Sequence, residues 1–119
     1  GEFILAVFAV GMDIGVDVQE MAECPDYREI AENFYTAEEA EDVKNEGPDL
    51  FFQYWAAKEA YVKALGIGLG RGMDFFSVRN GEITEKGRKG QGWHLYPVKI
   101  EGYAAYVAAH KKGDKSNEL

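Results

Sequence analysis

The sequence is poor in the features that disulfide-stabilised or membrane-bound proteins need. It holds a single cysteine, Cys24, so no disulfide bond can form within the chain. A lone cysteine fits a reducing compartment, and we expect a cytoplasmic protein. The apolar stretch Phe3–Val10 is too short to span a bilayer. Because it also lacks a basic flank and a small-residue cleavage site, it does not indicate a signal peptide, and we expect no membrane partner.

Positive charge is also scarce. The 13 lysines and arginines stand against 21 acidic residues, which gives a net charge of −8. Such a surface repels phosphate backbones, so we expect no nucleic-acid partner. A small anionic ligand held by a few lysines or by a metal ion stays compatible with this balance. The 119 residues, of which 46 % are hydrophobic, suffice for one globular domain.

Runs of apolar and β-branched residues predict strands at both ends of the chain. The first two strands, joined by a turn at residues 11–13, are expected to form a hairpin. In the second, Val16 and Val18 face one side, while Asp17 and Gln19 face the other. The predicted strands are Ile4–Val10, Ile14–Val18, Phe75–Val78, Glu82–Thr84, Trp93–Val98 and Tyr103–Ala109.

Helices are expected between these strands. A short helix over Arg28–Phe34 precedes Thr36 and Glu39, which have the spacing of a capping box for a helix over Ala37–Asn45. Asp49 is expected to cap a long helix over Leu50–Leu65 that ends at Gly66. The pattern predicts an α+β fold in which an antiparallel sheet packs against one main helix. Residues 1–110 are expected to form the domain, and residues 111–119 a polar tail.

The long helix and the second strand carry the candidate site residues. Glu59 and Lys63 are four residues apart, so they are neighbours on the helix surface. On spacing alone they predict a solvent-exposed ion pair worth about 0.3–0.5 kcal/mol. Asp17 and Gln19 share a strand face, and two oxygen ligands at that spacing suit one hard cation. A magnesium site forms if this strand meets the helix at Glu59, which periodicity alone does not show.

Three segments resemble those of the 4′-phosphopantetheinyl transferase superfamily. Gly15-Val-Asp17-Val-Gln19 is similar to the family's Gly-(Ile/Val)-Asp-(Ile/Val)-Glu strand. Ile30-Ala-Glu-Asn-Phe34-Tyr-Thr36-Ala-Glu-Glu39 is similar to its Ile-Ala-x-Arg-Phe-Phe-(Ser/Thr)-x-x-Glu segment. Trp55-Ala-Ala-Lys58-Glu59-Ala-Tyr-Val-Lys63-Ala-Leu-Gly66-Ile-Gly68 resembles its Trp-x-x-Lys-Glu-(Ala/Ser)-x-x-Lys-x-x-Gly-x-Gly helix. The segments follow one another in the family's order, which implies the half-fold of these transferases.

The resemblance implies an enzyme that moves the 4′-phosphopantetheine group of coenzyme A onto a serine of an acyl or peptidyl carrier protein, with Mg²⁺ on the pyrophosphate. By position, Asp17 resembles the family's first metal ligand, and Glu59 resembles a further ligand and the general base. Gln19 stands where many members have a second acidic ligand, so we expect magnesium binding to persist but to weaken. Lys58 and Lys63 resemble lysines near the pyrophosphate of coenzyme A, where Lys63 would offset charge on the leaving phosphate.

The resemblance also bears on how much of an enzyme this chain holds. The family has a small class of trimeric enzymes and a larger, surfactin-type class of two similar halves. A predicted strand before the Asp17 strand, together with Trp55, resembles the carboxy-terminal half of the larger class. Gly1–Phe3 then begins an excised half, or is a cloning remnant. The expected partners include a missing amino-terminal half or a second copy of the chain. The alternative is a non-catalytic half-domain that self-associates without turnover.

Other residues carry secondary expectations. Asp13 also resembles part of the aspartate strand motif, but it lies nearer the predicted turn, so Asp17 is preferred. His94 and His110 lie on predicted strands without acidic or cysteine neighbours at zinc spacing, and are expected to be ordinary strand residues. By the resemblance, Phe34 and Tyr35 are candidates for apolar contacts with the carrier protein.

Overall fold

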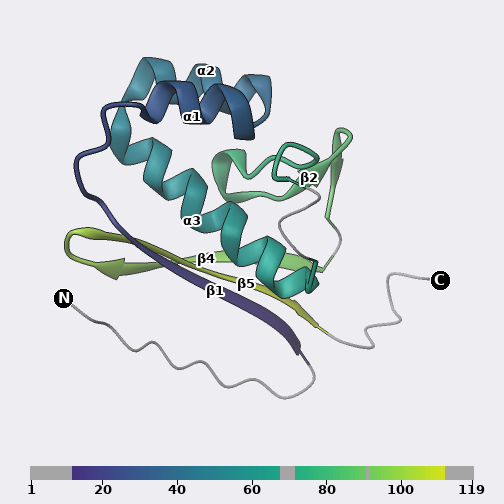
Figure 1. Ribbon diagram of the computed structural model, residues 1–119. Helices are drawn as coiled ribbons and strands as arrows, with labels where there is room; N and C mark the ends of the chain where they lie inside the picture. Colours follow the sequence, from purple (N-terminus) through teal and green to yellow (C-terminus); the bar gives the residue numbers. More distant parts are fainter. Residues whose placement is uncertain (1–11, 68–71, 91, 112–119) are drawn as a thin grey trace.

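A computed structural model describes residues 12–67, 72–90 and 92–111 of the chain. Three antiparallel strands form a sheet in the order β1-β5-β4, and the helix α3 lies across one face of it (Figure 1). This arrangement confirms the predicted α+β fold class. The elements are β1 (Met12–Glu20), α1 (Tyr27–Phe34), α2 (Ala37–Glu46), α3 (Pro48–Leu65), the 3₁₀ helix η2 (Arg79–Gly81), β2 (Thr84–Glu85), β3 (Arg88–Lys89), β4 (Trp93–Ile100) and β5 (Tyr103–Lys111).

Helix α3 is the central element of the fold. The sheet packs against one side of it, and α1 and α2 pack side by side against another (Figure 1). A helix covered on several sides buries residues around most of its circumference, and here these are Phe51, Tyr54, Ala56, Ala57, Lys58, Ala60, Tyr61 and Val62. Even so, none of the helices in the described residues has the length and hydrophobicity that a membrane span requires.

The ends of the helices follow local signals, with one correction. Thr36 Oγ1 accepts from Glu39 N at 3.2 Å, and Thr36 N donates to Glu39 Oε1 at 3.0 Å, which confirms the predicted capping box. Gly66 ends α3 in a left-handed conformation with φ of 72°. The predicted cap at Asp49 is wrong, because α3 begins at Pro48, and proline suits the first position of a helix.

Strand β1 is longer than predicted. Met12 and Asp13 do not form the expected turn, because both pair with β5, opposite Lys111 and His110. The long partner strand therefore overrides the local turn signal. By the same pairing, Lys111 belongs to β5, although it was expected to begin the polar tail. The strand predicted over Ile4–Val10, and its hairpin with β1, lie outside the described residues.

The segment Phe75–Val78 is not the strand that its apolar residues predict. It forms only a single bridge, between Ser77 and Thr84. The carbonyl of Phe76 and the amide of Val78 are instead bonded to the buried side chains of Lys58 and Glu39. Backbone groups that a sheet would use are thereby taken by side chains of α3 and α2.

Candidate active site

The site begins where β1 crosses α3. A Cβ atom added to Gly15 would lie 1.9 Å from the carbonyl oxygen of Ala60 and 2.4 Å from the amide nitrogen of Ala64. Only a residue without a side chain permits so close an approach of two backbones. Because side chains alternate along a strand, Asp17 lies on the same face of β1 as Gly15 and is pressed against α3.

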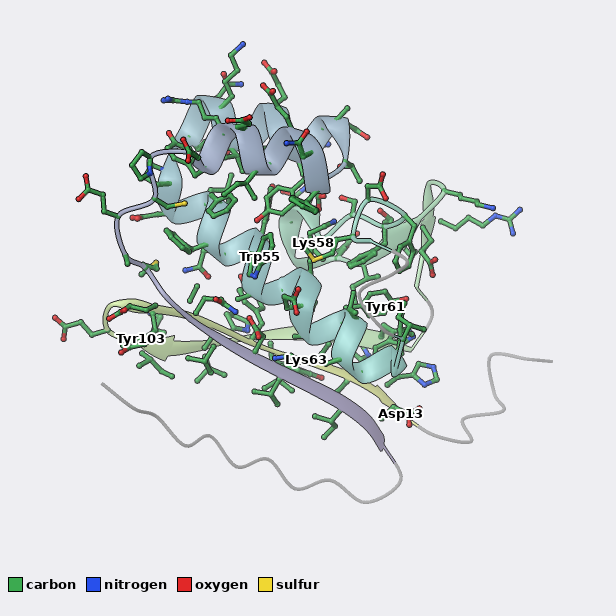
Figure 2. All side chains as sticks on the ribbon, in the orientation of Figure 1. Asp13, Trp55, Lys58, Tyr61, Lys63 and Tyr103 are labelled. Carbon is green, nitrogen blue, oxygen red and sulfur yellow. The ribbon has the colours of Figure 1, made fainter. Side chains whose placement is uncertain are left out.

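Asp17 is 4 % exposed, and both of its carboxylate oxygens accept hydrogen bonds. Lys63 Nζ donates to Oδ1 at 2.7 Å, and Gln19 Nε2 donates to Oδ2 at 2.6 Å. The Lys63 side chain runs from α3 toward the sheet and is 52 % exposed (Figure 2). The ion pair predicted between Glu59 and Lys63 is therefore wrong, because β1 offers Lys63 a closer, buried carboxylate.

Glu59 is half-buried on α3, close enough to Asp17 to feel its charge. Burial raises the pKa of Glu59, the negative charge of Asp17 raises it further, and the positive charge of Lys63 partly opposes both effects. Strand β1 thus meets α3 beside Glu59, as the predicted magnesium site requires. Two carboxylates that repel each other at one place are stabilised by a bound cation, and Lys63 alone does not balance their charge.

The donor atoms suit Mg²⁺ better than they suit a metal whose ligands all come from the protein. Asp17 and Glu59 would supply carboxylate oxygens. The Gln19 side chain would supply its amide oxygen if the amide group flips, so that its oxygen and nitrogen exchange places. Mg²⁺ is commonly held by one or two carboxylates, with waters and substrate phosphates completing its octahedron. In the part of the chain that the structure describes, no three His, Cys, Asp or Glu side chains come together to hold a metal. A magnesium ion held by these groups would keep coordination positions for a phosphate-bearing substrate.

Lys58 leaves α3 on the side opposite Lys63 and does not join this cluster (Figure 2). Its ammonium donates to Glu39 Oε1 at 2.6 Å and to the carbonyl of Phe76 at 2.6 Å, and both ends of the ion pair are fully buried. Burial lowers the pKa of Lys58, and the Glu39 carboxylate opposes that shift. The expected contact of Lys58 with coenzyme A is corrected to a structural ion pair, because the buried ammonium is already engaged.

The remaining candidate residues, Asp13, Phe34 and Tyr35, lie in different parts of the structure. Asp13 lies at the other end of β1, opposite His110, whose ring packs on Trp93 at 4.9 Å between centroids. Phe34 is 47 % exposed, as a partner-binding residue must be. Tyr35, in contrast, is buried and donates its hydroxyl hydrogen to the carbonyl of Phe51 at 2.7 Å. Tyr35 therefore belongs to the core, and its predicted role in carrier contact is wrong.

Two contacts around the site were not predicted from the sequence. The pairing of Glu39 with Lys58 joins residues 19 positions apart, and no local spacing signals it. The contact of Gly15 with α3 had a visible signal, because Ala60 and Ala64 are small residues four positions apart on one helix face. Such a stripe permits a close backbone approach, although it does not identify the strand that approaches.

Comparisons with known proteins find relatives of this chain. The 4′-phosphopantetheinyl transferase superfamily matches residues 13–109. A 4′-phosphopantetheinyl transferase of Bacillus subtilis is 39 % identical over 79 residues, which cover 63 % of this chain and 33 % of that protein. An L-aminoadipate-semialdehyde dehydrogenase-phosphopantetheinyl transferase of Rattus norvegicus is 22 % identical over 139 aligned residues, which cover 98 % of this chain and 45 % of that protein.

A solved structure shares the fold. A holo-(acyl-carrier-protein) synthase of Bacillus anthracis, in complex with CoA (3′,5′-ADP), superposes with a TM-score of 0.59 and 21 % sequence identity. The superposition covers 85 % of this chain and 96 % of that one. The chain spans about a third of the length of the bacterial relatives that it matches.

Proposed function

The chain belongs to the 4′-phosphopantetheinyl transferase superfamily, and on that premise we propose that it supplies the catalytic carboxylates of a magnesium-dependent enzyme that modifies a carrier-protein serine. The observation that carries the proposal is one contact. Asp17 and Lys63 are 46 positions apart in the sequence, yet they are bonded at 2.7 Å beside Glu59. Two acids and an exposed lysine from separate elements form a place where a pyrophosphate and a metal ion can be held together.

Each residue has a role in this reaction. Asp17, Gln19 and Glu59 would hold Mg²⁺, which supplies positive charge to the pyrophosphate of coenzyme A when bound. Glu59, whose pKa is raised, takes the proton of the serine hydroxyl. The serine oxygen bonds to the β-phosphorus, and the bond from that phosphorus to the bridging oxygen breaks. The leaving 3′,5′-adenosine bisphosphate takes the electron pair, and the exposed Lys63 ammonium offsets its charge.

No observation favours the alternative of a non-catalytic half-domain. Asp17, Glu59 and Lys63 are all present and lie together. The matched family and the bacterial relatives are transferases by their names. The amide of Gln19 removes one negative charge from the ligand set, which weakens metal binding without removing the base or the lysine.

Substitution of Glu59 by glutamine is expected to slow the transfer at least about 100-fold, because the amide neither accepts the serine proton nor binds the metal as an anion. The protein, coenzyme A, Mg²⁺ and an apo carrier protein are incubated together, and the carrier is weighed by mass spectrometry over time. The matched control is Glu101→Gln, which removes an exposed carboxylate from the β4–β5 turn. The proposal fails for this chain if the wild-type protein, at a concentration equal to the carrier's, adds no phosphopantetheine.

A further inference from the structure

Two side chains of this chain occupy both carboxylate oxygens of Asp17. The Lys63 ammonium donates to Oδ1 at 2.7 Å, and the Gln19 amide nitrogen donates to Oδ2 at 2.6 Å. An ionised carboxylate only accepts hydrogen bonds, so the Gln19 amide must turn its nitrogen, and not its oxygen, toward Asp17. Because the Asp17 side chain is only 4 % exposed, a hydrated metal ion has little open surface by which to reach these oxygens.

The charges at this place favour Lys63 and a metal ion as alternatives. Glu59 lies close enough to Asp17 and Lys63 to interact with both of their charges. The two acids and the one lysine leave a single negative charge, and a divalent cation added to all three would leave a single positive one. An ammonium and a metal ion on the same half-buried carboxylate repel each other. The pyrophosphate of coenzyme A is an anion that would attract the ammonium away from Asp17.

The Lys63 side chain has the freedom that such a change of partner requires. It is 52 % exposed, and its ammonium contacts β1 only through Asp17 and through the carbonyl of Val16, which lies 3.5 Å away (Figure 2). A lysine carries its charge on a flexible stem, so the ammonium can leave Asp17 while α3 and β1 keep their places. Lys58 differs in this respect, because its ammonium is fully buried between Glu39 and the carbonyl of Phe76.

From these contacts we infer that the Lys63 ammonium and the divalent metal ion are alternative partners of Asp17, and that Lys63 passes to the pyrophosphate of coenzyme A when the metal ion takes the carboxylate. The inference rests on the proposed function and assigns Lys63 two successive partners within it. The Gln19 amide flips in the same exchange, so that its oxygen faces the metal ion. Lys63 thereby couples the binding of the metal ion to the binding of coenzyme A.

Calorimetric titration of Mn²⁺ into Lys63 variants tests the competition. Lys63→Met is expected to bind Mn²⁺ alone at least about fivefold more tightly than wild type, because the competing cation is gone. A lysine that only supported the fold or the metal ligands would, on removal, weaken the binding instead. Lys63→Arg keeps a cation on Asp17 and is expected to stay within about twofold of wild type. Lys44→Met, which removes an exposed charge of α2, is the matched control and is expected to do the same.

Chemical labelling of lysines follows the ammonium itself. The chain is acetylated with a water-soluble active ester, and the modification of Lys63 is measured by peptide mass spectrometry, with the exposed Lys44 as internal reference. Mn²⁺ alone is expected to raise the labelling rate of Lys63 at least about threefold, because it releases the ammonium from Asp17. Acetyl-coenzyme A, whose thiol is blocked, is expected to lower the rate again when it is added with the metal. In Asp17→Asn, Lys63 is expected to label fast with and without Mn²⁺.

The outcomes separate this inference from the proposed function, because neither measurement needs a carrier protein or turnover. If Mn²⁺ binds but leaves the labelling of Lys63 unchanged, or binds no more tightly to Lys63→Met than to wild type, the exchange is overturned and the proposed function stands. If the wild-type chain binds no Mn²⁺, both are contradicted. If the exchange occurs as expected and an apo carrier protein is still not modified, the result counts only against the proposed function.

Discussion

Replacement of Gly15 by alanine is expected to lower the free energy of unfolding by about 3 kcal/mol and to remove the proposed metal site. The new Cβ would lie 1.9 Å from the Ala60 carbonyl oxygen and 2.4 Å from the Ala64 amide nitrogen. Both are backbone atoms of α3, so no side-chain rotation relieves the overlap and β1 must move away from the helix. Asp17 moves with it, and its bond to Lys63 is lost.

Chemical denaturation and a metal titration of the same variant measure the two effects. Gly90→Ala is the matched control, because a Cβ there meets its nearest atom at 3.4 Å, which is an ordinary contact distance or close to it. The control is expected to change stability by less than about 1 kcal/mol. A Gly15→Ala protein with wild-type stability would show that β1 does not approach α3 as closely as the structure has it.

Replacement of Lys58 by methionine is expected to cost about 3–5 kcal/mol of stability, because it leaves Glu39 as a buried charge without its counter-ion. Glu39 would keep its bonds from the amides of Thr36 and Val78, at 3.0 and 2.7 Å, but these do not neutralise it. The carbonyl of Phe76 would also lose its donor. Because the pair joins α2, α3 and the segment before η2, the loss is expected to affect unfolding of the whole domain.

A double-mutant cycle separates this interpretation from a role in coenzyme A binding. Lys58→Met with Glu39→Gln is expected to lose less stability than the sum of the two single variants, by about 2 kcal/mol. Lys44→Met, on the exposed surface of α2, is the control and is expected to stay within about 0.5 kcal/mol of wild type. Additive losses, or a Lys58→Met protein that is stable but binds coenzyme A poorly, would restore the role predicted from the resemblance.

The parts of the fold that depend on neighbouring residues were predictable from the sequence. The capping box at Thr36, the end of α3 at Gly66 and the strands β4 and β5 all rest on local signals, and the structure has each of them. Two of the wrong predictions have a different cause. The bridge at Ser77 and the start of β1 at Met12 were decided by distant partners, which no local pattern describes.

In the site, too, local sequence signals did not predict the contacts between distant residues. Asp17, Gln19, Glu59 and Lys63 were identified as a set through the family resemblance, because strand and helix periodicity alone gave no contact between them. The structure differs in the partner of Lys63, which was predicted to pair with Glu59 and is bonded to Asp17. Lys58 and Tyr35 were misassigned for one reason. The packing around α3 buries them, and the number of elements that cover a helix is a property of the whole fold.

The central claim is that β1 and α3 together build one magnesium site, and a metal titration of β1 variants tests it most directly. Mn²⁺ is titrated into the protein and displaced by Mg²⁺, with wild type, Asp17→Asn, Gln19→Glu and the control Asp13→Asn compared. The account predicts one site per chain that weakens at least about tenfold in Asp17→Asn and tightens about tenfold in Gln19→Glu. Asp13→Asn, four residues away on the same face of β1, is expected to match wild type. Equal affinity in all four proteins would contradict the claim.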